Sequence, residues 1–254
     1  MRNRFLSFAT TAFILAAACG GKSGQVAATP AHKASAPVVE YQARWDNLTP
    51  SGPFNEVEMI IDFAPGAWTT VHSHGGPGFV MVVTGQVTKR ANGSEFTYRA
   101  GQTWHEEAGE VHQVGNPTSN PARAIAVVLL PTGAAITTDV AGAPKPAIPA
   151  TVTRTTLNAP AVASPLDQIR TVFDFAPGAW TPMHKHSGPA LITVLEGEMT
   201  LRQDGVDRVF RAGESWTEAA GQVHKAGNAS GARARVVSNY LVPRGAQATT
   251  VVGS

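Results

Sequence analysis

Short apolar or alternating segments make up most of the chain beyond its N-terminal region, and each is bounded by Gly, Pro, Asn or Asp. Examples are EVEMIIDF at 56–63, GFVMVVTG at 78–85 and ARAIAVVLL at 122–130. Such segments are typical of β-strands, and no stretch repeats its apolar residues with a helical period. ANGS at 91–94 and QDGV at 203–206 indicate tight hairpin turns. The pattern therefore predicts an all-β fold, a sandwich or small barrel of short antiparallel strands.

The same pattern occurs twice. DFAPGAW stands at 62–68 and again at 174–180, and the match between the copies continues without a gap over 62–134 and 174–246. The offset of 112 residues exceeds the roughly 20–50 residues of solenoid repeats and suits whole domains of about 100 residues. We therefore predict two domains of the same fold.

Composition sets the expected boundaries. Residues 133–166 are rich in Ala, Thr and Pro, and we expect them to connect the domains, with an edge strand around Thr151–Thr155. Residues 19–45 begin with a run of Ala, Gly, Pro and Ser without any period, which predicts a flexible tether. The domains are then expected at 46–146 and 147–254.

The N-terminal segment predicts export. Arg2 and Arg4 precede the apolar run FATTAFILAAA, which is too short to span a bilayer and has the form of a secretory leader over 1–18. The following Cys19 makes the segment resemble a bacterial lipoprotein signal, in which that cysteine carries the lipid. An ordinary signal peptide is the alternative. The expected location is the periplasm or the outer membrane, with a lipid on Cys19 as the membrane contact.

Charge argues against one class of partner. The chain has 20 basic and 18 acidic residues and a formal net charge of +2, and two of the arginines lie in the leader. It shows no basic stripe and no interleaving of basic and aromatic residues, so nothing indicates a nucleic-acid interface. The expected partner is a small-molecule substrate, and homo-oligomerisation stays open.

Histidines are the candidate chemistry. Each copy contains an HxH sequence, and alternate residues of a strand face the same side, so the two rings should share one space. A third histidine follows a glycine-rich turn in each copy, and three neutral imidazoles make a facial site for a divalent transition metal. A protein that keeps the three histidines but binds no metal is the alternative. The candidate ligands are His72, His74 and His112 in the first copy and His184, His186 and His224 in the second.

These residues resemble the two motifs of the cupin superfamily, and the chain resembles a tandem two-domain cupin, or bicupin. The matching positions are Gly66, His72, His74, Gly85, Gly101, Gly109, His112 and Asn116, and in the second copy Gly178, His184, His186, Gly197, Gly213, Gly221, His224 and Asn228. The resemblance implies two antiparallel β-barrels of jelly-roll type, each with an internal metal site.

The sequence departs from the family pattern at the glutamate of the first motif, which is usually the fourth metal ligand. Gly78 and Ala190 stand in its place. The resemblance then implies three-histidine sites, which some cupin dioxygenases use on iron. It makes oxalate-decarboxylase or oxidase chemistry less favoured, because those relatives depend on that glutamate.

Glu106 and Glu218 are shared by the copies although their neighbours differ. A carboxylate inside a barrel would be desolvated unless it met a metal or a donor. We therefore predict that these two residues are catalytic, as a fourth ligand or as a general acid or base beside the metal. An outward-facing or backbone-bonding glutamate is the alternative.

Three functions remain open from the sequence. The first is an exported dioxygenase of quercetinase-like type, with iron as the expected metal and Mn, Ni, Cu or Zn as alternatives. The others are a non-catalytic metal- or ligand-binding lipoprotein and a cupin isomerase or lyase. Because Phe79, Met81, Leu191 and Thr193 are apolar or small and are expected to line the barrel mouths, they indicate a non-ionic ligand.

Overall fold

The computed structural model describes residues 35–253. The predicted leader, Cys19 and residues 19–34 of the predicted tether lie outside the described residues. Within the described range the chain is built of β-strands and contains no helix, as the alternating pattern predicts. Residues 35–253 therefore include no helix that could cross a membrane.

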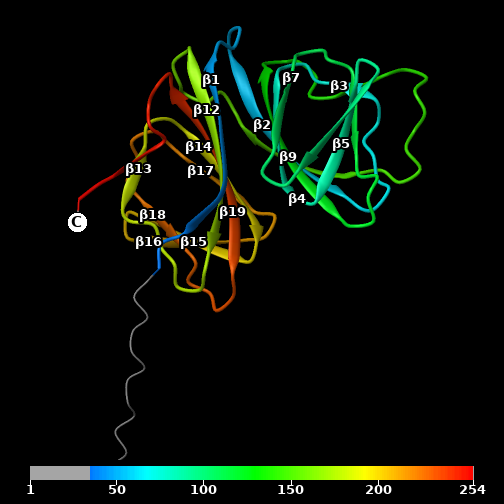
Figure 1. Cartoon of the computed structure of the whole chain (residues 1–254). Helices are drawn as coiled ribbons and strands as arrows, with labels where there is room; N and C mark the ends of the chain where they lie inside the picture. Colours follow the sequence, from blue (N-terminus) through cyan, green and yellow to red (C-terminus); the bar gives the residue numbers. More distant parts are fainter. Residues whose placement is uncertain (1–34, 254) are drawn as a thin grey trace, which may run out of the picture. The chain divides into compact units, whose positions relative to one another are not determined.

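The strands form two barrels (Figure 1). The first barrel contains β2 (Phe54–Phe63), β3 (His72–Ser73), β4 (Gly78–Thr84), β5 (Gln86–Ala91), β6 (Ser94–Arg99), β7 (Thr103–Glu106), β8 (His112–Gly115), β9 (Ala122–Pro131), β10 (Thr138–Asp139) and β11 (Thr151–Leu157). The second contains β1 (Val38–Leu48), β12 (Leu166–Phe175), β13 (His184–His186), β14 (Ala190–Glu196), β15 (Glu198–Gln203), β16 (Val206–Arg211), β17 (Ser215–Glu218), β18 (Lys225–Gly227), β19 (Ala234–Pro243) and β20 (Thr249–Val251).

Each barrel closes around its own apolar core. In the first, the sheet β11-β2-β9-β4-β7 faces the sheet β10-β3-β8-β5-β6. In the second, the sheet β1-β12-β19-β14-β17 faces the shorter sheets β16-β15-β18 and β13-β20. Alternate residues of β2, such as Val57, Met59 and Ile61, fill the first core, and Ile169 on β12 lies in the second. The repeat in the sequence is thus a repeat of the barrel.

The barrels exchange one strand each. β1 pairs antiparallel with β12 of the second repeat, whereas β11 pairs antiparallel with β2 of the first. Residues 38–45 of the predicted tether are therefore part of β1. The predicted boundary at 146/147 likewise assigns β11 to the wrong sheet. Strand pairing is long-range, and β1 and β11 share almost no sequence identity, so a boundary drawn from composition could not detect the exchange.

The faces of the two large sheets that point away from their own cores pack against each other in two apolar clusters. The first cluster contains Ile60, Met81, Val83, Ile125, Val172, Leu195 and Val237, and the second contains Phe54, Phe79, Val127, Leu129, Leu166 and Leu241. Between them lies a polar group. There, Thr193 and Asn239 of the second barrel donate hydrogen bonds to Glu58 of the first, at 2.6 and 2.5 Å.

This packing corrects one prediction. Phe79, Met81 and Thr193 lie between the barrels, and the buried Leu191 lines neither cavity, so these four residues do not form the barrel mouths. The physical reason is the period of two along a strand. On β4 it is Val80 that faces the barrel core, and the face bearing Phe79 and Met81 is covered by the other barrel.

The shared glycines serve two different needs. Gly93 and its preceding Asn92 both have positive φ, 74° and 51°, in the two-residue turn between β5 and β6, as the hairpin prediction requires. Gly115 has another role, because a Cβ there would lie 2.0 Å from the ring of Trp68. The counterpart Gly227 is equally close to Trp180, at 2.1 Å.

Candidate metal centres

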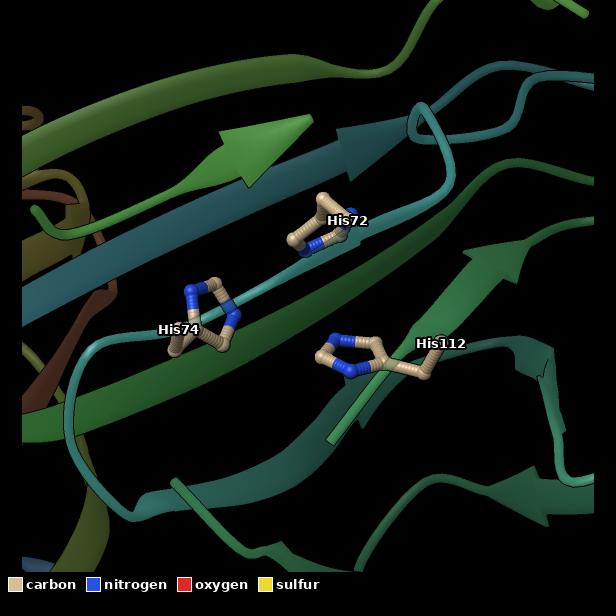
Figure 2. Close-up of side chains that lie close together, drawn as sticks. All are labelled: His72, His74 and His112. Atoms are coloured by element: carbon tan, nitrogen blue, oxygen red, sulfur yellow. The ribbon is translucent and has the colours of Figure 1, made fainter. Parts of the chain in front are cut away.

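Each predicted histidine triad is brought together inside its barrel. His72 on β3 pairs directly with His112 on β8, and His184 on β13 forms a bridge with His224. In each triad one nitrogen per ring lies within 4.8 Å of the other two. Figure 2 shows the three rings of the first triad turned toward one shared space. The sequence prediction that HxH and a later histidine converge is therefore confirmed at both sites.

The other ring nitrogen of every histidine is tied to the backbone. A carbonyl oxygen can only accept, so Nδ1 carries the hydrogen and Nε2 keeps its lone pair for the shared space. The Nδ1 atoms contact the carbonyl oxygens of Thr70 (from His72, 2.8 Å), Ile136 (from His74, 2.6 Å), Glu110 (from His112, 3.0 Å), Pro182 (from His184, 2.9 Å), Ala248 (from His186, 3.1 Å) and Gln222 (from His224, 3.0 Å). The tautomer and ring orientation needed for metal binding are thus set by the backbone.

Burial favours the neutral form of these rings. It lowers the pKa of His72, His74 and His112 below the ordinary value, and it lowers the pKa of His184 to about 4. Neutral imidazole is the form that ligates a metal. The first triad and His184 are therefore prepared as ligands at neutral pH.

Glu106 and Glu218 point into the same sites. Glu106 on β7 pairs with Gly78 on β4, and Glu218 on β17 pairs with Ala190 on β14, the two positions where the sequence lacks the usual glutamate. A Cβ at Gly78 would lie 3.0 Å from Glu106 Oε2, so the small residue makes room for the carboxylate. The acidic side chain is thus supplied from the neighbouring strand.

Both carboxylates are buried and are oriented by a tryptophan. The indole N–H of Trp104 donates to Glu106 Oε1, and that of Trp216 donates to Glu218 Oε1, each at 2.8 Å. Only 2 % of Glu106 and 4 % of Glu218 is exposed. The outward-facing alternative considered from the sequence therefore does not hold.

The second carboxylate lies closer to its histidines than the first. Glu218 is 2.8 Å from His186 Nε2 and 3.0 Å from His224 Nε2. Burial acts to raise the pKa of Glu218, but hydrogen bonds from these rings, which they donate through Nε2 when protonated, outweigh burial and lower the pKa to about 2. At His224 burial acts to lower the pKa, and the hydrogen bond and charge of Glu218 reverse this and raise it.

This geometry fits a cation. With Nδ1 donating to the backbone, Nε2 and a carboxylate oxygen at 2.8–3.0 Å present lone pairs to each other. Such a contact is repulsive unless a proton or a metal ion lies between the two atoms. Three imidazole nitrogens and one carboxylate form a donor set suited to a divalent transition metal. Both triads could hold such an ion.

The first site also contains an ion pair, Lys89 and Glu110, that the comparison of the two sequence repeats did not identify. Buried Lys89 on β5 lies 2.5 Å from Glu110 Oε1 and 3.9 Å from Glu106 Oε1. Glu106 is correspondingly farther from its histidines, 3.3 Å from His112 and 3.7 Å from His74. The equivalent positions of the second repeat are Leu201 and Gln222, so a search for shared residues could not find this pair.

A cavity opens beside each triad. The first has a volume of about 180 Å³ and the second about 320 Å³. Trp68 and Arg154 line the first, whereas aromatic residues such as Phe173 and Tyr240 line the second. The exchanged strand β11 contributes Arg154 to the first cavity, and Pro37 next to β1 lines the second, so each cavity is lined partly by the segment that its barrel receives in the exchange.

Comparison with known families and structures agrees with this architecture. The family described as cupin domain matches residues 59–128 and 171–240, which together exceed half of the chain. No curated protein sequence that was compared with the chain matches it.

Several solved structures share the fold at low sequence identity. AerE from Microcystis aeruginosa is 14 % identical with a TM-score of 0.50, covering 82 % of this chain and 98 % of its own. Lactobacillus farciminis oxalate decarboxylase in a formate complex is 14 % identical with a TM-score of 0.54, covering 86 % of each chain. Vicilin from hazelnut, Corylus avellana, is 10 % identical with a TM-score of 0.57, covering 82 % of this chain and 86 % of its own. At these identities the likeness concerns the fold alone.

Proposed function

We propose that this chain, which belongs to the cupin family as a tandem of two cupin domains, is an exported metal-dependent enzyme of dioxygenase type acting on a small oxygenated organic molecule. One observation carries the proposal. In each barrel three buried Nε2 atoms converge on a space that a carboxylate closes on one side and a cavity opens on the other. A structural ion needs no such cavity, whereas a catalytic ion keeps a position open for a ligand.

The protein residues have separate roles in this proposal. His72, His74, His112 and their counterparts hold the ion, and their backbone contacts fix the direction of each lone pair. Iron(II) or another divalent ion would supply, when bound, the binding and activation of dioxygen and of an oxygenated substrate. The apolar cavity walls exclude water from that space.

Glu106 and Glu218 are proposed as the fourth ligands. Their Oε1 atoms are occupied by the tryptophan N–H groups, which leaves Oε2 directed toward His74 or His186. The same oxygen could hold a proton taken from the substrate, which is the general-base role. Both roles need a carboxylate, so Gln in its place should impair either one.

Export and a lipid anchor on Cys19 complete the proposal. The leader-like composition of residues 1–18 supports them. Placement in the periplasm or outer membrane would give the enzyme access to dioxygen and to small molecules entering the cell envelope.

A non-catalytic metal or ligand carrier is the second candidate. The observation that favours it is the small volume of the first cavity, about 180 Å³, which leaves little room for both dioxygen and an aromatic substrate. If only one barrel turns over a substrate, the first would serve for binding alone, and the second, with a cavity of about 320 Å³, is the better place for turnover.

Metal content of the purified full chain tests the proposal, measured by mass spectrometry beside His72→Ala and His184→Ala. We expect about two equivalents of a redox-active metal, falling by one in each variant, and oxygen uptake with phenolic or diketone substrates. Zinc without oxygen uptake would support the carrier or a lyase instead. Wild-type protein that takes up no metal even after reconstitution would overturn the metal-dependent function.

A further inference from the structure

The two cavities differ in charge. Apart from the triad and Glu106, the first cavity is lined by one ionised side chain, Arg154. The second is lined by no lysine or arginine. If each site holds one divalent ion and one carboxylate, the first cavity is more positive than the second by one unit.

Arg154 reaches the first cavity from the exchanged strand. On β11 it pairs directly with Met59, and Val152 pairs with Ile61, and all four residues line the cavity. Met59 and Ile61 belong to the core of the first barrel, so the face of β11 that bears Arg154 points toward the interior. Arg154 itself is exposed, which places its side chain at the cavity mouth.

No residue in the described part of the chain neutralises Arg154. Its guanidinium makes no hydrogen bond or ion pair there, whereas Arg44, Arg123 and Arg235 each contact a carboxylate.

The second repeat has no such cation. The position equivalent to Arg154 is Gln42 on β1, paired with Thr171. The amide of Gln42 donates a hydrogen bond to the Thr171 hydroxyl at 3.0 Å, and neither residue lines the second cavity. The difference is therefore specific to the first site.

We propose that the first cavity binds a small carboxylate, held by the guanidinium of Arg154 at the mouth. This inference rests on the proposed function, because it takes the metal-facing cavity as the ligand site. A guanidinium matches a carboxylate with two parallel N–H···O bonds. The volume of about 180 Å³ corresponds to roughly six water molecules at about 30 Å³ each, so the acid has only a few carbon atoms.

Isothermal titration calorimetry on the metal-reconstituted full chain tests this, with malonate as the probe and its neutral isostere malonamide beside it. We expect malonate to bind more tightly than malonamide, and Arg154→Gln to weaken malonate by at least about tenfold while leaving malonamide unchanged. Arg208→Gln is the matched control, because it removes an exposed arginine on β16 that lines neither cavity. It should change neither affinity.

Metal content of the same samples distinguishes a failure of this inference from a failure of the proposed function. If the wild type and Arg154→Gln hold equal metal and bind malonate equally, the inference is wrong and the proposed function stands. Absence of malonate binding, or equal affinity for malonate and malonamide, also overturns it. Malonate binding that depends on Arg154 in a protein that takes up no metal would keep the inference and remove the proposed function.

Discussion

The two barrels hold their histidines in the same way and differ in what surrounds them. Ring centroids within the triads are 4.5–5.2 Å apart in the first barrel and 4.3–5.1 Å in the second. Yet Glu218 approaches its imidazoles more closely than Glu106 does. Only the first site has the cationic residues Lys89 and Arg154 nearby. Ligand geometry is thus set by the fold, while electrostatics is set by a few side chains that vary between the repeats.

Side chains that differ between the repeats also set the electrostatics where the two barrels meet. Glu56 and Glu58 on β2 occupy the positions equivalent to Gln168 and Arg170 on β12, and all four are buried. Arg170 donates to Asn239 Oδ1 and to the carbonyl of Ile125, each at 2.7 Å, and burial raises the pKa of Glu58 while the positive charge of Arg170 acts to lower it. If two copies of the chain associated through this face of their first barrels, Glu56 and Glu58 of one copy would meet the same residues of the other. The repulsion between these carboxylates disfavours that association.

Replacement of Arg170 should lower the free energy of unfolding more than any other single substitution considered for this protein. Arg170→Met leaves Asn239 Oδ1 and the carbonyl oxygen of Ile125 without their buried donor and removes the positive charge that favours ionised Glu58, and such losses together cost about 3–5 kcal/mol. The free energy of unfolding from urea titration measures it, with the surface substitution Arg208→Met as the control. Adding Glu58→Gln should recover part of the loss. A cost below about 1 kcal/mol would show that the polar group between the barrels does not hold them together.

Stability should also depend on pH through Glu56. Burial raises the pKa of Glu56 from 4.5 to about 8, and the charge of Glu58 adds to this. The folded protein therefore keeps a proton that the unfolded chain releases above its pKa of 4.5, so stability falls as pH rises toward 8. The loss is at most about 1.4 kcal/mol per pH unit.

Glu56→Gln makes this position identical to its counterpart Gln168 and should remove that dependence. We expect the wild type to lose up to about 2.7 kcal/mol between pH 6 and pH 8, and the variant to lose distinctly less. Urea unfolding at the two pH values measures this. Equal losses in both proteins would mean that Glu56 is not the group that titrates.

The sequence predicted the parts of the molecule that the repeats share. The all-β fold, the six histidines and the inward position of Glu106 and Glu218 all follow from residues present in both copies. A comparison of the two copies could not identify functional residues that occur in only one of them, such as Lys89 and Arg154. Arg154 also lies on a strand whose pairing crosses from one repeat to the other, and no local pattern encodes which sheet an edge strand joins.

Metal affinity should respond more to Glu218 than to Glu106. Glu218 is within 3.0 Å of two ligand nitrogens, whereas Glu106 is no closer than 3.3 Å and shares its charge with Lys89. We expect Glu218→Gln to weaken metal binding at the second site by about 10- to 100-fold, and Glu106→Gln to weaken the first site by less. Chelator competition measures both. If Glu106→Gln lowers metal affinity more than Glu218→Gln does, the prediction is wrong and the first site depends more on its carboxylate.

The smallest effect, and the most direct test of the comparison, comes from giving the first site the residues of the second. The double variant Lys89→Leu with Glu110→Gln replaces a half-buried ion pair by the residues found at Leu201 and Gln222 in the second repeat. Lys89 attracts the Glu106 carboxylate and repels a bound cation, so its removal frees Glu106 for the ion. Metal affinity at the first site should rise about threefold to tenfold.

The control for this variant removes an ion pair whose residues line neither cavity. Arg211→Leu with Glu198→Gln deletes an exposed pair, 3.4 Å apart, on β16 and β15. It should leave both metal affinities unchanged. If the Lys89→Leu, Glu110→Gln variant also leaves the first site unchanged, the longer distances from Glu106 to its histidines arise from the backbone of the first barrel. The two sites would then differ in their scaffold, and the varying side chains around the histidines would not set how tightly each site holds its ion.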